Sequence, residues 1–247
     1  MARKPQDAPM QQSLKALLGL RALVLQGGVE PGKRLSEIAL SERLNVSRTP
    51  LRAALQRLEQ EHLVELIPSG GYAVRRFTHQ EAVDSIELRG TLEGVAARFA
   101  AERGVVPARL KAAWSIVHAL DETLDSNPDS FDFSRYEQLN EDFHETLADL
   151  SGSDVIRREI ARVTSLPFAS PSAFTNTHVN VPGFLKTLTI AQSQHRAIIS
   201  AIEMREGARA EALAREHARL ARQTLDFVME EKPDLRTRVP ALTLLAV

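Results

Sequence analysis

Apolar residues recur every three or four positions along most of this chain, which is the periodicity of amphipathic helices. Two short helices are predicted between residues 34 and 60, separated by a break at residues 45–47. Their apolar positions are Leu35, Ile38, Leu40 and Leu44 in the first helix and Leu51, Leu55 and Leu58 in the second. Ser47 is placed to cap the second helix, and Pro50 lies in its first turn, where a missing N–H costs nothing.

Basic and polar side chains gather where the second of these helices begins, at Arg48, Thr49 and Arg52. Two short helices joined by a tight turn, with basic residues opening the second, form the layout of a helix-turn-helix. Two short apolar runs then flank residues 68–71 (Pro-Ser-Gly-Gly), which indicates a β-hairpin in the position of a wing. The alternative interpretation is a helical hairpin that only packs against its surroundings.

The second helix and the turns before it closely resemble the GntR family of bacterial transcription regulators. The resemblance rests on Pro31-Gly32-Lys33-Arg34-Leu35, Val46-Ser47-Arg48-Thr49-Pro50-Leu51-Arg52, Ala54-Leu55 and Arg57-Leu58-Glu59. It implies a winged helix-turn-helix whose second helix enters the major groove of double-stranded operator DNA. The DNA contacts that it implies come from Arg34, Ser47, Arg48, Thr49, Arg52, Gly70 and Gly71. Ile38 and Gly70 depart from the family, because basic residues are common at both positions.

The composition is that of an ordinary globular protein with room for two modest domains: 247 residues, 43% hydrophobic and 26% charged. No stretch has the uninterrupted apolar length of a membrane span, and no signal-peptide pattern opens the sequence. The absence of cysteine excludes disulfides and thiolate metal sites. We therefore expect a cytoplasmic protein with no membrane partner.

Charge is distributed unevenly along the chain. Residues 1–80 contain 12 Lys and Arg against 7 Asp and Glu, whereas the remainder contains 19 against 25. A basic N-terminal part joined to an acidic remainder fits a protein whose N-terminal domain binds DNA phosphates and whose C-terminal domain does not contact DNA. Chance variation among solvated faces explains the same numbers, so charge alone does not decide between them.

The predicted fold is mostly α, with an N-terminal winged helix-turn-helix and a C-terminal all-helical antiparallel bundle. Residues 1–12 are polar, contain two prolines and are expected to be disordered, and the DNA-binding domain is expected to cover 13–77. Nearly all of 78–232 reads as helix, and forms the predicted effector-binding and dimerisation domain. Residues 233–247 are an apolar tail that could pack on the body or on a partner subunit.

Three histidines fall on the apolar faces of three different predicted helices: His144, His195 and His217. Each buried imidazole needs a partner, and one divalent cation supplies a shared partner for all three. Asn140 precedes His144 by four residues, so their side chains can converge. The alternative is that these are core residues whose ring nitrogens find ordinary hydrogen bonds.

The segments around these histidines look like the FCD effector domain of the FadR subfamily. The resemblance rests on Ile86-Glu87-Leu88-Arg89 with Leu92-Glu93, Leu139-Asn140-Glu141-Asp142-Phe143-His144, His195-Arg196-Ala197-Ile198 and His217. It implies a divalent metal held by Asn140, His144, His195 and His217, with Asn140 standing where the family has its stronger ligand, Asp. A site dominated by imidazole favours zinc, nickel or manganese over magnesium.

The resemblance also implies a small carboxylate effector at the open positions of the metal. Arg89, on the first bundle helix, is the candidate for holding that anion. The alternative role for Arg89 is an ion pair with Glu93, four residues later on the same helix.

These observations predict a ligand-responsive transcription regulator that acts as a repressor and binds DNA as a homodimer, and no enzymatic activity. One rival is a metal-dependent hydrolase that uses the three-histidine site, because such a site resembles a catalytic zinc centre with an open position. The basic winged helix is unnecessary for an enzyme. The other rival is a regulator in which the metal only holds the bundle together.

Overall fold

The computed structural model describes residues 7–124, 131–173, 184–231 and 240–246. The chain divides into two compact units, which we call the N-terminal unit and the helical unit. The N-terminal unit comprises Met1–His79 and Pro240–Val247, and the helical unit comprises Gln80–Val239. Helices dominate both units, which confirms the predicted fold class. None of the described helices is long and apolar enough to cross a membrane.

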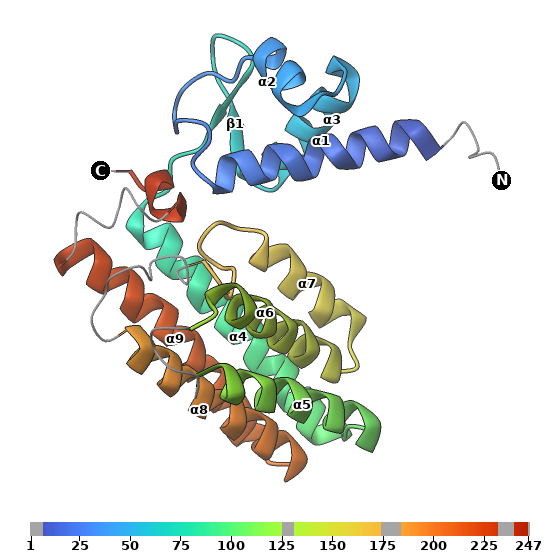
Figure 1. Cartoon of the computed structure of the whole chain (residues 1–247), viewed down its shortest axis with the longest axis vertical. Helices are drawn as coiled ribbons and strands as arrows, with labels where there is room; N and C mark the ends of the chain where they lie inside the picture. Colours follow the sequence, from blue (N-terminus) through green and yellow to red (C-terminus); the bar gives the residue numbers. More distant parts are fainter. Residues whose placement is uncertain (1–6, 125–130, 174–183, 232–239, 247) are drawn as a thin grey trace. The chain divides into compact units, whose positions relative to one another are not determined.

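The N-terminal unit is a winged helix-turn-helix (Figure 1). Its elements are α1 (Asp7–Leu25), α2 (Glu37–Leu44), α3 (Arg48–Gln60), β1 (Val64–Leu66) and β2 (Tyr72–Val74). The two strands pair antiparallel and form the wing, with Val64 opposite Val74. The apolar stripe of α3 is fully buried, because its leucines face α1 and α2 while its charged residues face solvent.

Three details of this unit differ from the sequence-based expectation. The first helix begins at Asp7, so residues 7–12 are helical; Pro9 lies in the first turn, where no intrahelical bond needs its N–H. Ile38 is 56% exposed, because Leu35 and Leu40 occupy the core positions of this region. Ser47 holds the N-cap position of α3 but its side chain makes no capping bond, since Pro50 stands where the N–H would be.

The apolar tail belongs to the N-terminal unit. It forms the 3₁₀ helix η4 (Pro240–Leu244), and Leu242, Leu244 and Leu245 are buried. The backbone of Phe77 holds it on both sides: the Phe77 N–H donates to the Leu244 carbonyl at 2.9 Å, and the Ala246 N–H donates to the Phe77 carbonyl at 2.7 Å. Residues 232–239, which join the tail to the preceding helix, lie outside the described ranges.

The helical unit is an α-helical bundle (Figure 1). Its helices are α4 (His79–Arg103), α5 (Pro107–Leu124), α6 (Phe133–Leu150), α7 (Asp154–Thr164), α8 (Phe184–Glu203) and α9 (Gly207–Glu231). Its main core draws on α4, α5, α6, α8 and α9, including the buried Tyr136, Phe143 and Ile198. Residues 165–173 form turns between α7 and α8, and residues 174–183 lie outside the described ranges.

Two glycines bring α4 and α9 into close contact. A Cβ atom added at Gly90 would lie 2.5 Å from the Cβ of Ala218, and one added at Gly94 would lie 2.9 Å from the Cγ of Arg215. Side chains larger than hydrogen therefore do not fit at these two positions of α4. The close approach places the residues beside them, Arg89 and Glu93, next to α9.

Candidate DNA-binding surface and metal centre

Residues with the predicted DNA-binding role surround one hollow of about 450 Å³ on the N-terminal unit. Four of the seven line it: Arg34, Arg48, Arg52 and Gly71. The three arginines are exposed. The Arg52 Nε atom donates to the carboxylate of Glu37 at 2.8 Å, an ion pair that orients the guanidinium while leaving it 65% exposed. Arginines held this way at the start of a helix are suited to phosphates and base edges.

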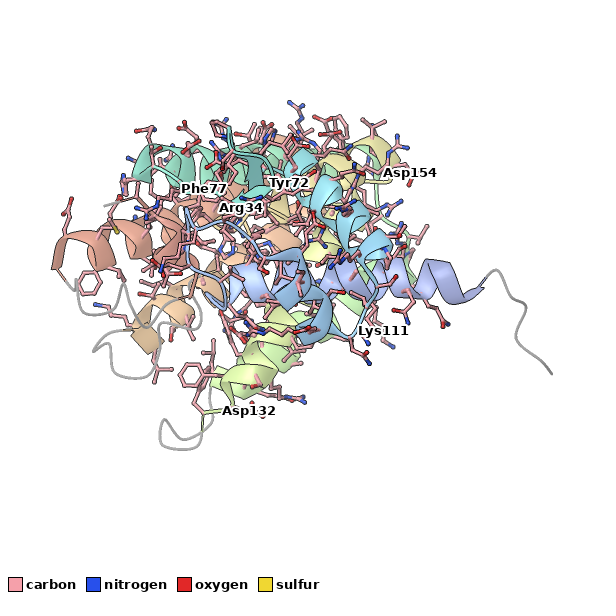
Figure 2. The ribbon with its side chains drawn as sticks, turned by 90° about the horizontal axis from the view of Figure 1, so that it is seen from above. Arg34, Tyr72, Phe77, Lys111, Asp132 and Asp154 are labelled. Atoms are coloured by element: carbon pink, nitrogen blue, oxygen red, sulfur yellow. The ribbon has the colours of Figure 1, made fainter. Side chains whose placement is uncertain are left out.

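The wing comes close to this hollow through its glycines. Gly70 and Gly71 both have positive φ, at 81° and 92°, which suits residues without a Cβ. A Cβ at Gly71 would lie 3.3 Å from the Nε atom of Arg34, so the wing passes directly beside that arginine. The backbone of Arg34 also forms an antiparallel β-bridge with Ala73 of β2, next to Tyr72. Arg34 and Tyr72 are labelled in Figure 2. Ser47 and Thr49 are exposed at the start of α3, and Ser47 borders a separate hollow.

The three histidines meet inside the helical unit, coming from α6, α8 and α9. All three are buried: His144 is 4% exposed, His195 0% and His217 8%. The Nε2 atom of His217 lies 3.0 Å from that of His195 and 3.4 Å from that of His144. Three ring nitrogens therefore face a common point, with all candidate ligand atoms within 4.8 Å of one another.

The opposite nitrogen of each ring is bound to an oxygen. The Nδ1 atoms of His144, His195 and His217 lie 2.9–3.1 Å from the side-chain oxygens of Glu93, Gln192 and Gln194 respectively. The amide orientation of Gln192 is fixed, because its nitrogen donates to the Val117 carbonyl at 2.8 Å and to Asp121 at 2.6 Å. The Nδ1 atoms of His144 and His195 thus carry the proton, and their Nε2 lone pairs face the Nε2 atom of His217.

Burial and the neighbouring rings favour the neutral form of two of these histidines. Burial, followed by the neighbouring His217 and His144, holds the pKa of His195 well below its usual value. Burial and His144 lower the pKa of His217 to about 3. Neutral imidazole is the form that a divalent metal binds. The donor set therefore fits a metal such as zinc, nickel or manganese.

A narrow cavity of about 60 Å³ lies beside the histidines. Arg89, Asn140, His144 and His217 all contribute to its wall, so the structure brings the predicted effector and metal residues together. The Nε and NH1 atoms of Arg89 are buried and have no hydrogen-bond partner among the described residues. The alternative role of Arg89 is present as a long ion pair, since its Nε atom lies 4.0 Å from the Oε2 atom of Glu93.

Sequence reasoning gave Glu93 no place in the site. It is fully buried on α4, and its Oε1 atom accepts the Nδ1 proton of His144. Burial raises the pKa of Glu93, but the interactions with His144, including its hydrogen bond, and with the Arg89 guanidinium outweigh burial and lower that pKa to about 2. The signal in the sequence was two charged residues, Arg89 and Glu93, on the apolar face of a predicted helix.

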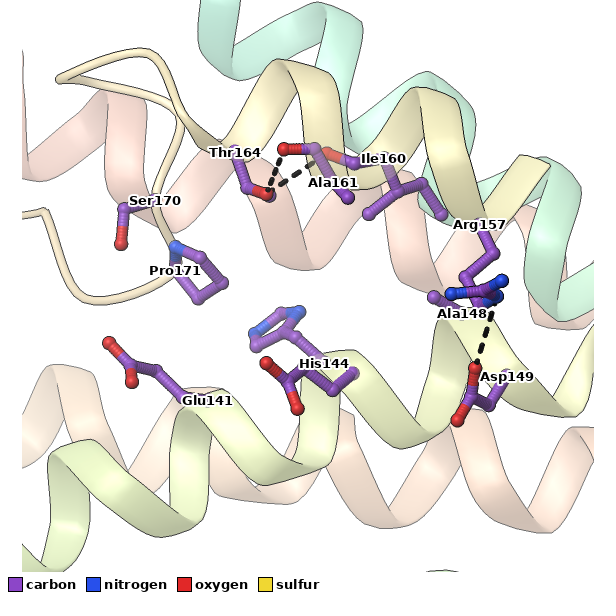
Figure 3. A pocket seen from close by; sticks show the side chains of 11 residues that line it. Glu141, His144, Ala148, Asp149, Arg157, Ile160, Ala161, Thr164, Ser170 and Pro171 are labelled. Atoms are coloured by element: carbon purple, nitrogen blue, oxygen red, sulfur yellow. Dashed lines mark hydrogen bonds and ion pairs between the residues drawn. The ribbon is translucent and has the colours of Figure 1, made fainter. Parts of the chain in front are cut away.

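A larger cavity of about 450 Å³ also reaches His144, between α6 and α7 (Figure 3). Acidic residues line its α6 side, among them Glu141, which Figure 3 shows turned toward Ser170 and Pro171. Partial burial and the carboxylates of Glu137 and Glu145 raise the pKa of Glu141. A cavity with this charge is suited to the passage of cations.

Comparison with known protein families assigns both parts of the chain. Residues 13–74 match the family of bacterial regulatory proteins called gntR, and residues 84–220 match the FCD domain. The second match alone covers more than half of the 247 residues.

Individual relatives agree with these matches. An HTH-type transcriptional regulator of Streptomyces ambofaciens is 28% identical over 88% of this chain and 86% of its own. The HTH-type transcriptional repressor GlaR of Escherichia coli is 25% identical over 83% of this chain and 91% of its own. Among solved structures, Escherichia coli McbR/YncC superimposes with a TM-score of 0.65 at 18% identity, covering 89% of this chain and 98% of that one, which shows a shared fold.

Proposed function

Because this chain belongs to the GntR family of bacterial transcription regulators and carries an FCD effector domain, we propose that it is a metabolite-controlled repressor. It is a DNA-binding regulator and not an enzyme. In the proposed mechanism a small carboxylate binds at a metal in the helical unit and releases the protein from its operator. The relative GlaR is a named repressor, which supports this sign of regulation.

The converging Nε2 atoms of His144, His195 and His217 carry the proposal for the metal. The Nε2 atom of His217 lies 3.0 Å from that of His195 and 3.4 Å from that of His144, and the Nδ1 atom of each ring is bound to an oxygen, so the three Nε2 atoms are the ones that can face a cation. A divalent cation can accept all three Nε2 lone pairs at once. Asn140 can add a neutral oxygen from the same wall of the cavity. Zinc, nickel and manganese are the proposed ions.

Arg89 supports a carboxylate effector. Its unpartnered Nε and NH1 atoms are buried in the cavity that also borders the metal ligands. An unsatisfied buried guanidinium is costly, and a carboxylate is its natural partner because the two pair through parallel hydrogen bonds. The cavity of about 60 Å³ has room for such a group or for a few water molecules.

On the N-terminal unit, we propose that Arg34, Arg48 and Arg52 contact DNA, with Ser47, Thr49 and the wing glycines Gly70 and Gly71 close to the backbone. The exposure of the three arginines around one hollow supports this assignment. One small winged helix covers little DNA surface, so a specific operator requires two copies on a palindromic site. The working form in this proposal is a homodimer in the cytoplasm, where its operator lies.

The test uses the purified full-length chain and labelled DNA from the region upstream of its own gene. Operator affinity is measured by fluorescence anisotropy, with and without small carboxylates, in the metal-free and zinc-loaded protein. His144→Ala is compared with His118→Ala, because His118 is exposed and outside the cluster. The proposal requires that carboxylate release DNA from the zinc-loaded wild type and the His118→Ala variant, and not from His144→Ala.

The other outcomes separate the rival interpretations. A protein that binds zinc, while no carboxylate changes its operator affinity, has a structural metal. A protein that takes up no zinc, nickel or manganese contradicts the metal site, and the histidines are then core residues. Melting temperatures are recorded for each variant, since loss of a metal that supports the fold also lowers stability.

A further inference from the structure

The carboxylate of Glu93 contacts His144 at Nδ1, the ring nitrogen opposite the one that faces His217. Glu93 is 0% exposed, and its Oε1 atom accepts a hydrogen bond from the Nδ1 atom of His144 at 2.9 Å. Among the described residues, the Nδ1 partners of His195 and His217 are glutamine side chains, whereas that of His144 is the carboxylate of Glu93. Its second oxygen, Oε2, has no hydrogen-bond partner and lies 4.0 Å from the Nε atom of Arg89.

The hydrogen bond has a geometric consequence. A carboxylate can only accept, so the proton of His144 must lie on Nδ1. The Nε2 lone pair is then directed toward the Nε2 atom of His217, 3.4 Å away. A hydrogen bond of this kind to the back of a histidine ligand fixes its tautomer and raises its basicity.

Glu93 also supplies negative charge close to the proposed cation. Three imidazoles and the amide of Asn140 are all neutral, so these groups leave the two positive charges of a bound cation uncompensated. Arg89 adds a further buried positive charge beside them. Uncompensated buried charge is strongly unfavourable, and a negative group is needed close to the cation. Glu93 is positioned to supply it through His144.

We propose that Glu93 is the positioning residue of the metal centre and the source of its negative charge. Asn140 is a neutral ligand, and Glu93 supplies the missing charge through its hydrogen bond to His144. This inference rests on the proposed metal site and identifies its ligand as a divalent cation. Two residues of α4 then have different roles: Glu93 orients a metal ligand, and Arg89 binds the anionic effector.

The experiment measures zinc affinity by competition with a chromophoric chelator at constant pH, on the full-length protein. Glu93→Gln keeps the size of the side chain and an oxygen that can accept from Nδ1, but removes the charge. We expect zinc affinity to fall by about 10–100-fold, the usual effect of removing such a partner. Glu122→Gln is the control, because Glu122 is an exposed α5 carboxylate that lines neither of the two cavities beside His144; the zinc affinity of this variant should stay within about twofold of wild type.

A rescue variant separates charge from general damage. Asn140→Asp restores a negative charge on the other side of His144, so the double variant Glu93→Gln, Asn140→Asp should regain most of the lost affinity. A purely structural role for Glu93 predicts the same gain in affinity from Asn140→Asp in the wild type and in Glu93→Gln, whereas the charge argument predicts a larger gain in Glu93→Gln. Melting curves of the metal-free proteins show whether each variant is folded.

The outcomes are distinguishable from those that test the proposed function. If wild type binds zinc and Glu93→Gln binds it equally tightly, the metal site stands and the role of Glu93 is wrong. If Glu93→Gln loses affinity and Asn140→Asp does not restore it, the charge argument is overturned. If wild type itself binds no divalent metal, the proposed function fails together with this inference.

Discussion

The contact between α4 and α9 at Gly90 allows the architecture of the site to be tested away from its polar residues. A methyl group added at Gly90 would place its carbon 2.5 Å from the Cβ of Ala218, well inside van der Waals contact. The obstruction is another Cβ, not the end of a flexible side chain, so the two helices must move apart. Gly90→Ala therefore changes the spacing of α4 and α9 without touching Arg89, Glu93 or His217.

Two effects of opposite sign decide the stability of this variant. In an exposed helix, replacing glycine with alanine stabilises by roughly 1 kcal/mol. Overpacking a closely packed contact destabilises by about 1–3 kcal/mol, and the obstructing Cβ of Ala218 can move only together with the backbone of α9. We expect overpacking to win, so that the net loss is about 1 kcal/mol and the melting temperature of this unit falls by about 2–4 °C.

The assay combines calorimetry with zinc competition. The partner variant Ala218→Gly removes the opposing methyl group, so the double variant Gly90→Ala, Ala218→Gly restores the space. We expect Gly90→Ala to weaken zinc binding, because Glu93 lies on α4 and His217 on α9, the two helices that it separates, and we expect the double variant to recover. The two residues are in contact, so their effects should be non-additive. A Gly90→Ala protein with wild-type melting temperature and zinc affinity would refute this reasoning.

Four further expectations can be checked directly. Leu244→Ala removes a fully buried side chain of the tail and should cost about 2–5 kcal/mol in the N-terminal unit, measured by calorimetry against Leu18→Ala, which is 53% exposed. Arg48→Ala and Arg52→Ala should each weaken operator binding by about 1–3 kcal/mol if the arginine reads a base, whereas a phosphate contact reduces the salt slope by about one; anisotropy titrations distinguish the two, and an unchanged double variant contradicts both. Light scattering should give twice the chain mass of 27.3 kDa, and a monomer that occupies the operator singly would contradict the dimer. In metal-free protein the pKa of His217 is lowered to about 3, so below pH 6.5 the unfolded state binds a proton that the folded state does not; stability should fall by about 2 kcal/mol between pH 6.5 and 5 in urea titrations, and a His217→Gln protein should lack this contribution.

Much of this molecule follows from local patterns in its sequence. Helix periodicity and the turn at residues 45–47 predicted the winged helix, because α3 buries Leu51, Leu55 and Leu58 at the expected spacing and α2 buries Leu40. The convergence of His144, His195 and His217 was also accessible, since each histidine shares a face with apolar residues of its own helix. A buried face must point to the core, so separate helices bring such residues together.

Other features depended on contacts between distant parts of the chain. Glu93 is 51 residues from His144, and no local pattern indicates that the two side chains meet. Two glycines four residues apart on α4 were the one local sign that another helix approaches there closely. The sequence also did not predict that the tail packs in the N-terminal unit, because an apolar run of residues gives no information about which of two cores it joins.

The cavity beside Arg89 bears on how an effector can act. Its volume of about 60 Å³ has room for a carboxylate group. An effector whose binding requires the surrounding helices to move apart selects a rarer state, and its apparent affinity is reduced by the rarity of that state. Its wall includes α4, whose first residue, His79, is two residues after Phe77, the residue that holds the tail. At 1.5 Å per residue, Arg89 lies only about 15 Å along α4 from that start. If effector binding and the separation of α4 from α9 are the same movement, Gly90→Ala must weaken operator binding without any carboxylate, in the same anisotropy assay in which the wild type requires one.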